Sequence, residues 1–493
     1  MPVFNTGTLV PLVHLAGPAD WDLLPTLCRD FLTARDRDRL RAYLAASAQS
    51  VLVEADYIDK DYRDTYANFY AKKFLDYPCR NVRLHFFRCQ VPPNGIWELS
   101  KYQNDYIGNV VIRPTRINSI GRTLLDPRRI SGRVGTACLT EYKVNVLGTE
   151  LSVTSFPYIT QDTDVTVCAH AACWMVFRYM SERYRRYAEV WPYEITQLTT
   201  DVSLGRLVPS NGLTVAQVSE IFFRFGLSPK IYHRPALVAG FPGDPTLFDR
   251  LLYYYIESGL PVVASLPSKK HAVTIFGHLS DYNKALPAGS VSNSNGYVEG
   301  LVVNDDNHLP YQLIPRAGSG APAHPDNYVT SDIEAFVVPL YEKIYLQAEH
   351  FEQLARNVIE KSTISLGAVK SSLTPDQVVM RILLTTSRSY KRVRLRTTPS
   401  LGKIYSYTLM PKFIWVAELS TRDLYKQGKV FGEVIWDGTE NAYDANGLML
   451  VHYPDLLILN NDYQFSKTGG KYYAAPCAFG DYEVYRNNLK EIV

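Results

Sequence analysis

The stretch from Cys168 to Asp306 constrains the fold most, because its hydrophobic pattern predicts helices first and strands afterwards. One helix is expected to begin near Cys168 and a second at Thr214, where the TVAQ run supplies an N-cap and a capping-box partner. A third helix is expected over 245–258, and the runs LPVVASL, HAVTIFGH and GLVVNDD predict strands. This order is typical of an α+β unit, and we assign residues 151–315 to it.

Length and composition place this unit between two others. A chain of 493 residues exceeds what one hydrophobic core normally serves, and 46% hydrophobic against 20% charged residues is an ordinary globular balance. Residues 1–150 mix strand-like runs with an amphipathic stretch at 60–74, so we expect an N-terminal α+β domain. The turn-forming run at 316–327 predicts a domain boundary, and residues 328–493 are expected to form a C-terminal α+β or β-rich domain.

Two further expectations concern the flanking domains. Thr374 as N-cap and Pro375 at the first helical position predict a helix over the run TPDQVVMRILLTTS. The 35 tyrosines suit half-buried strands and interfaces, so the Tyr-rich flanks are expected to present a surface to a protein partner.

Charge and patterning exclude several classes of protein. A formal net charge of +3 argues against a dedicated nucleic-acid surface, and basic runs such as 35–41 and 391–396 are interpreted as solvated faces. No window approaches the twenty apolar residues of a spanning helix, and the first residues show no signal-peptide pattern, so we expect no membrane association. The seven cysteines are odd in number and lack paired spacing, which predicts free thiols in the cytoplasm.

Cys168 has the sequence context of a thiol nucleophile. Only a thiolate attacks a carbonyl, and a helix N-terminus supplies partial positive charge that favours it. Ala169, Ala171 and Ala172 keep the first turn narrow, so that a substrate can approach. Gln161 is expected to donate its side-chain amide to an oxyanion beside the Cys168 backbone N–H.

A base and its orienting group follow on adjacent predicted strands. His271 opens a strand after the SKK turn, so its ring can project from the sheet edge toward the helix terminus. Asp305, at the end of the next strand, is expected to accept a hydrogen bond from the other imidazole nitrogen. Strand alternation predicts that Asn304 and Asp306 point to the opposite face.

These residues carry a resemblance to a known family. The run CAHAACWMV, preceded by Gln161, is similar to the Gln and the Cys-Gly-Pro-(Ala/Thr)-Ser-Leu-Ala-Met-Val of the C39-like branch of papain-like cysteine peptidases. The runs GLTVAQVSEIFFRFGL, GLPVVASL, HAVTIFGH and VVNDD resemble the helix and strands that follow in that family. The resemblance covers the central unit alone and implies a papain-like fold and hydrolysis of a protein or peptide substrate, with no cofactor or metal. It also implies Cys168 as nucleophile, His271 as base, Asp305 as its orienting acid and Gln161 as oxyanion donor.

The chain departs from the family pattern at four positions. Ala169 and His170 replace Gly and Pro after the nucleophile, and Lys270 stands where a Gly commonly precedes the His. Gln161 is one residue further from the thiol than usual. These departures concern the shape of the cleft and the oxyanion geometry, and His170 is expected to line the cleft or lie on the surface.

The same residues allow other interpretations. Cys173 is a competing nucleophile because Cys-Trp is common at papain-like sites, but about 140° of helical rotation separates it from Cys168, so both cannot face His271. We expect Cys173 to be a small buried hydrophobe. A metal site of Cys168, His170 and Cys173 lacks further ligands at a suitable spacing. Transglutaminase-like acyl transfer and a catalytically inactive binding or regulatory module stay open.

Overall fold

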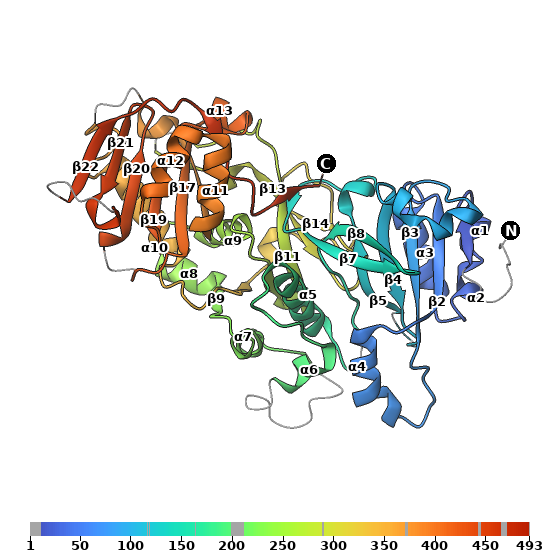
Figure 1. Cartoon of the computed structure of the whole chain (residues 1–493). Coiled ribbons are helices and arrows are strands. Elements are labelled where there is room, and N and C mark those ends of the chain that lie inside the picture. Colours follow the sequence, from blue (N-terminus) through green and yellow to red (C-terminus); the bar gives the residue numbers. More distant parts are fainter. Residues whose placement is uncertain are drawn as a thin grey trace.

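The computed structural model describes residues 11–115, 117, 119–162, 164–198, 212–287, 290–369, 373–441, 445–464 and 471–492. The chain is mixed α+β, with 33% of the described residues helical and 29% in strands, which confirms the predicted class. Three units follow one another along the molecule, with the N-terminal unit at one end, helix α5 near the middle and the C-terminal unit at the other end (Figure 1). No helix among the described residues has the length and apolarity needed to cross a bilayer.

The N-terminal unit is built on an antiparallel sheet whose strands lie in chain order. Its hydrophobic strand runs bury side chains on both faces, since Val51 and Val53 pack with helices on one side while Leu52 packs with a hairpin on the other. The expected boundary after residue 150 is wrong, because it cuts a strand of that hairpin. The elements are β1 (Leu12–His14), β2 (Ser50–Tyr57), β3 (Asn81–Phe87), β4 (Tyr106–Ile112), β5 (Ile120–Leu125), the hairpin β7 (Thr140–Val146) and β8 (Thr149–Ser155), and helices α1 (Pro18–Trp21), α2 (Leu24–Leu27), α3 (Ala34–Leu44) and α4 (Lys60–Asn68).

The central unit is a sheet with the strand order β14-β13-β11-β10-β15-β9, extended by β6 and β24. The expected boundary at 316–327 is also wrong, because the chain returns after it to place β15 beside β10. The turn-forming run is therefore a long loop of the central unit. The elements are β6 (Thr136–Ala137), β9 (Lys230–His233), β10 (Val262–Leu266), β11 (His271–Ser280), β13 (Val298–Asn304), β14 (Gln312–Pro315), β15 (Ala335–Val338) and β24 (Lys490–Glu491), with helices α5 (Cys168–Arg183), α6 (Pro192–Gln197), α7 (Val215–Arg224), α8 (Arg234–Gly240) and α9 (Leu247–Glu257).

The C-terminal unit is a sheet with the order β12-β16-β17-β19-β20-β21-β22. The helix expected after Thr374 is wrong: a capping box forms around the single turn Pro375–Gln377, and the chain then enters a buried strand. The apolar run from Val378 is buried at nearly every position, as a central strand requires. The elements are β12 (Ser292–Asn293), β16 (Val378–Thr386), β17 (Phe413–Thr421), β18 (Lys429–Val430), β19 (Gly432–Asp437), β20 (Leu448–His452), β21 (Leu456–Asn460), β22 (Tyr472–Pro476), β23 (Tyr482–Glu483), α10 (Ala348–Glu360), α11 (Ser387–Thr397), α12 (Pro399–Tyr407) and α13 (Arg422–Lys426).

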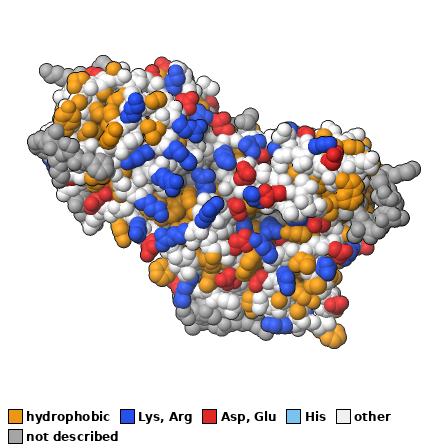
Figure 2. Space-filling model, in the orientation of Figure 1, with side chains coloured by type: hydrophobic (Ala, Val, Ile, Leu, Met, Phe, Trp, Pro, Cys, Tyr) orange, Lys and Arg blue, Asp and Glu red, His pale blue; other side chains and the backbone are white. Residues whose placement is uncertain are grey.

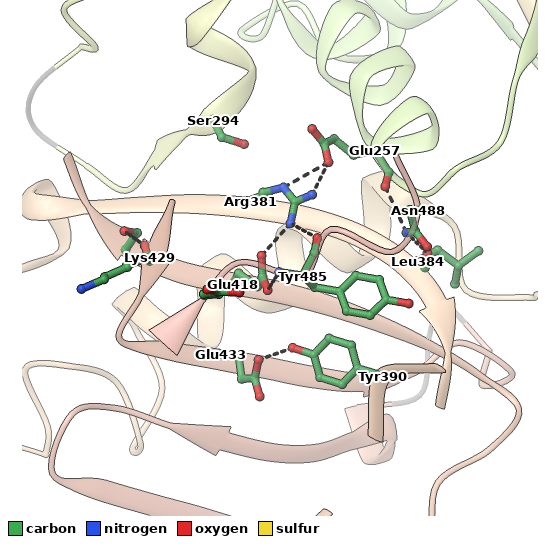
Figure 3. A network of polar contacts seen from close by, with 12 residues as sticks. Glu257, Ser294, Arg381, Leu384, Tyr390, Glu418, Lys429, Glu433, Tyr485 and Asn488 are labelled. Atoms are coloured by element: carbon green, nitrogen blue, oxygen red, sulfur yellow. Dashed lines mark hydrogen bonds and ion pairs between the residues drawn. The ribbon is translucent and has the colours of Figure 1, made fainter. Parts of the chain in front are cut away.

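Buried charges join the central and C-terminal units (Figure 3). Arg381 on β16 contacts Glu257 of α9 at 2.5 Å and Glu418 of β17 at 2.7 Å. The side-chain amide of Asn488 donates to backbone oxygens of both units, at Glu257 and Leu384. Because a buried ion is tolerated only with its partners in place, these contacts fix the position of one unit against the other.

The tyrosine enrichment belongs mainly to the interior. Nine of the twelve largest fully buried side chains are tyrosines, and they lie in all three units. Buried tyrosines supply apolar area to a core while their hydroxyl groups find partners. The enrichment therefore does not mark the flanks as a protein-facing surface, contrary to the expectation from composition. The exposed tyrosines among the described residues are Tyr282, Tyr345, Tyr407, Tyr472 and Tyr473.

Candidate active site

Cys168 is the first residue of helix α5, as the sequence predicts. The loop before the helix is held by Asp162, whose Oδ1 accepts the backbone N–H groups of Asp164, Val165 and Thr166. No side chain caps the helix at Val167, so the backbone N–H groups of the first turn point toward the space beside the thiol. The half-buried thiol thus sits in the positive end of the helix dipole.

His271 opens strand β11, which packs against α5. The hydroxyl of Thr274 donates to the backbone oxygen of Ala172 at 3.2 Å and joins the strand to the helix. Lys270 ends the preceding turn with a φ of 51°, in the left-handed region that favours glycine. This geometry brings the imidazole to Cys168, and the two side chains interact.

Two carboxyl groups face the other side of the imidazole. Asp305 Oδ1 lies 2.7 Å from His271 Nε2, and Asp306 Oδ1 lies 3.5 Å from the same atom. The expectation that Asp306 points away is wrong, because β13 ends at Asn304 and strand alternation stops there. Asn304 does turn away, and its side chain bonds to Pro157 and Tyr311.

His324 completes the outer side of the site, and sequence reasoning missed it. Its Nε2 lies 3.6 Å from Asp305 Oδ2, and its ring stacks on Tyr328 with centroids 4.5 Å apart. The backbone N–H of Asp326 donates to His324 Nδ1, so the proton of the neutral ring is on Nε2 and points toward Asp305. The composition of the 316–327 run predicts a domain boundary, and its single histidine is the only signal in that run that points to the site.

In the buried site, the opposite charges of His271 and Asp305 counteract the effect of burial on each other's pKa. Burial would lower the pKa of His271, but its bonds to Asp305 and Cys168 and the charges of both carboxylates raise it to about 11. Burial would raise the pKa of Asp305, but the hydrogen bond and charge of His271 hold it below its ordinary value. Burial, together with the charge of Asp305, raises the pKa of Asp306 to about 7, and burial lowers the pKa of His324 to about 4. The site therefore holds an imidazolium beside one firm carboxylate and one carboxyl that titrates near neutrality.

Gln161 lies at the acid side of the site. Its side-chain amide donates to Asn307 Oδ1 at 3.2 Å, and the backbone N–H of Asn307 donates to Asp305 Oδ1 at 2.9 Å. The structure thus links Gln161 to the loop that carries the acid. Donation from Gln161 to an oxyanion beside Cys168 stays a prediction, and the uncapped N–H groups of α5 are the donors already in place.

A cleft of about 360 Å³ opens onto Cys168 and His271. Its walls come from the start of α7 and from strands β10 and β15, and they are largely apolar, with Val218, Val263 and Phe336 among the lining side chains. His170 was expected in the cleft or on the surface, but it is buried, and burial lowers its pKa to about 4. The neighbouring Ala169 lines the cleft instead, which leaves room at the first turn.

Cys173 does not compete for the role of nucleophile. It is fully buried, and burial raises the pKa of its thiol, which confirms that it is a packing residue. Among the described residues, two groups of close metal-type ligands occur, His271 with Asp305 and Asp306, and Asp305 with His308 and Asp326. In both groups the imidazole contacts a carboxylate at hydrogen-bond distance.

Comparisons with known proteins do not place the chain in a family. No family model, no curated protein and no solved structure matches it. The function must therefore be argued from the geometry of the site.

Proposed function

We propose that the chain is a cysteine peptidase with a papain-like, C39-like centre that hydrolyses a peptide or isopeptide bond of a protein substrate. The observation that supports this most directly is the line of contacts from Cys168 at a helix N-terminus through His271 to Asp305. A cationic imidazole beside a thiol at the positive end of a helix favours the thiolate, which is the nucleophilic form.

The residues have defined roles in this proposal. The Cys168 thiolate attacks the substrate carbonyl carbon, and the carbonyl oxygen becomes an oxyanion beside the N–H groups of the first turn of α5. Since Asp305 engages Nε2 of His271, the other ring nitrogen, Nδ1, gives its proton to the leaving amine as the carbon–nitrogen bond breaks. His271 then takes a proton from water, the resulting hydroxide attacks the acyl carbon, and the carbon–sulfur bond breaks to restore the thiolate.

The setting of the thiols is consistent with this chemistry. Free cysteines are found at all seven positions, and thiols are kept reduced in the cytoplasm, where disulfides are rare. We therefore place the proposed activity in the cytoplasm.

Labelling and cleavage test the proposal together. The wild type, Cys168→Ala and Cys173→Ala are treated with an iodoacetamide-alkyne probe and with a proteome-derived peptide library, and mass spectrometry identifies the labelled residue and the cleaved bonds. We expect Cys168 to be labelled and defined bonds to be cut by the wild type and by Cys173→Ala, but not by Cys168→Ala.

Three results would contradict the proposal. Labelling and cleavage that depend on Cys173 would move the nucleophile. An unreactive Cys168 with no cleavage would favour an inactive module on a peptidase fold. Products that carry an added amine in place of hydrolysis would favour acyl transfer.

A further inference from the structure

Basic side chains gather on one face of the C-terminal unit, along a segment whose own sequence has no acidic residue. Residues 387–412, which form α11, α12 and the chain leading to β17, contain no Asp or Glu. Lys and Arg side chains are concentrated over the part of the surface where Figure 1 shows α11 (Figure 2). The formal net charge of +3 conceals this local excess. The basic residues of the segment are Arg388, Lys391, Arg392, Arg394, Arg396, Lys403 and Lys412.

Helix α11 sorts its arginines between interior and surface. Arg394 is fully buried and neutralised by Glu418 at 2.5 Å and Glu433 at 3.1 Å. Arg388, Arg392 and Arg396 follow one another at intervals of four residues, so they lie on one face of the helix, and all three are exposed. None of the three forms an ion pair with a carboxylate of the described residues. The charge of Arg394 is thus balanced within the fold, whereas the exposed Arg388, Arg392 and Arg396 repel one another without a compensating carboxylate.

Two hollows continue the basic surface toward the centre of the molecule. One, of about 320 Å³, lies at the start of α11 and is lined by Arg183 and Arg392. The other, of about 410 Å³, is lined by Arg128, Lys426, Arg486 and Lys490 together with Glu257 and Glu491, and Arg486 pairs with Glu491. The segment from Val484 to Glu491 forms part of the walls of both hollows, so they adjoin each other.

Lys490 shows that the region between the hollows is cationic. Its pKa is lowered by burial and by the nearby charges of Arg183 and Arg128, despite the opposing effects of Glu141 and Asp126. A cation whose neighbours oppose its charge is stabilised by an anion that approaches it. The larger hollow also contains the ring of Tyr282, and Tyr407 stands 73% exposed on α12.

We propose that this basic band binds single-stranded nucleic acid. The band is defined by Arg183, Arg388, Arg392, Arg396, Lys403 and Lys490, and Arg128, which pairs with Asp126, lies at its edge. A row of unpaired arginines tracks a phosphate backbone, and exposed aromatic rings offer platforms on which bases stack. A membrane surface is flat and cannot fill the two hollows, and an acidic polypeptide makes no use of the stacking positions. The proposal revises the expectation that the small net charge excludes a nucleic-acid partner.

The test measures binding of a fluorescein-labelled, mixed-sequence single-stranded oligonucleotide by anisotropy. The Cys168→Ala chain is used throughout, so that failure of the proposed peptidase activity does not affect the result. Charge reversal of Arg388, Arg392 and Arg396 to Glu should weaken binding at least tenfold. The matched control reverses three exposed basic residues of the N-terminal unit, Arg35, Lys72 and Arg80, and should change affinity less than twofold.

Salt dependence supplies a second measurement. If the band neutralises about five phosphates, affinity should fall about 100-fold between 50 and 200 mM salt, because each phosphate contributes a slope of about −0.7 for single strands. Circular dichroism checks the fold of each variant, and Arg→Gln substitutions at the same three positions repeat the test with a smaller perturbation.

The proposal is overturned if the oligonucleotide does not bind at 50 mM salt, or if the control substitutions weaken binding as much as those on α11. It is also overturned if vesicles containing phosphatidylserine, or polyglutamate, bind more tightly than the oligonucleotide and lose binding in the α11 variant.

Discussion

Replacing Asp305 by Asn should remove the charge that keeps His271 protonated. The carboxylate and imidazole are 2.7 Å apart. At an effective dielectric constant of about 20, two unit charges at that distance attract by about 6 kcal/mol, or between four and five pKa units. Burial lowers the pKa of His271, but its bonds to Asp305 and Cys168 and the charges of both carboxylates together raise it from 6.5 to about 11. In the variant the bond and charge of Asp305 are lost while burial remains, so the pKa of His271 is expected to fall and a smaller fraction of the ring to be protonated at neutral pH.

The consequence is measurable at Cys168 without a known substrate. A protonated His271 beside the sulfur assists its attack on an electrophile, so Cys168 of the wild type should react readily with iodoacetamide at pH 6. Without the cation this assistance is lost. We therefore expect alkylation of Cys168 at pH 6 to be slower in Asp305→Asn than in the wild type by about tenfold or more.

Peptide mapping by mass spectrometry follows each cysteine separately. Cys79 is exposed and lies outside the site, so its alkylation rate should be the same in both proteins. A wild-type Cys168 that reacts no faster than Cys79, or equal rates at Cys168 in the two proteins, would refute the argument.

Three further predictions concern buried polar side chains, two in the candidate active site and one in the C-terminal unit. His324→Ala should slow alkylation of Cys168 at pH 6 about threefold. His324→Phe keeps an aromatic ring but lacks the N–H donor, so it should slow alkylation equally. If His324→Phe instead reacts at the wild-type rate, the role of His324 is packing alone. Asp306 titrates near 7 in the folded protein against 3.8 unfolded, so its burial costs stability once pH exceeds 3.8, reaching up to about 4 kcal/mol above pH 7. Asp306→Asn should accordingly raise the Tm more at pH 8 than at pH 4, and an equal effect at both would contradict this sign. Arg394→Met should cost about 3–5 kcal/mol in chemical denaturation, because Glu433 is left buried without a counter-charge and Glu418 keeps only Arg381; a loss below about 1 kcal/mol would contradict it.

Local patterns in the sequence were enough to predict much of the central unit. Thr214 and Gln217 form the capping box that the TVAQ run predicts, and α5 begins at Cys168. These features depend on neighbouring residues, so they can be inferred from spacing. The same logic failed after Thr374, where a capping box closes a single turn, because burial in a central strand outweighs a local helix signal.

The position of the base relative to the thiol depends on contacts between segments that are distant in the sequence. The sequence by itself determined which residues have suitable chemistry, namely Cys168, His271 and Asp305, because helix starts and strand ends are local. Tertiary structure alone decided that Asp306 also faces His271. It also decided that His324, from a run whose composition predicts a domain boundary, lies next to Asp305. The physical reason is that contacts made beyond the end of a strand follow the path of a loop, and that path is fixed by packing between distant segments and not by sequence periodicity.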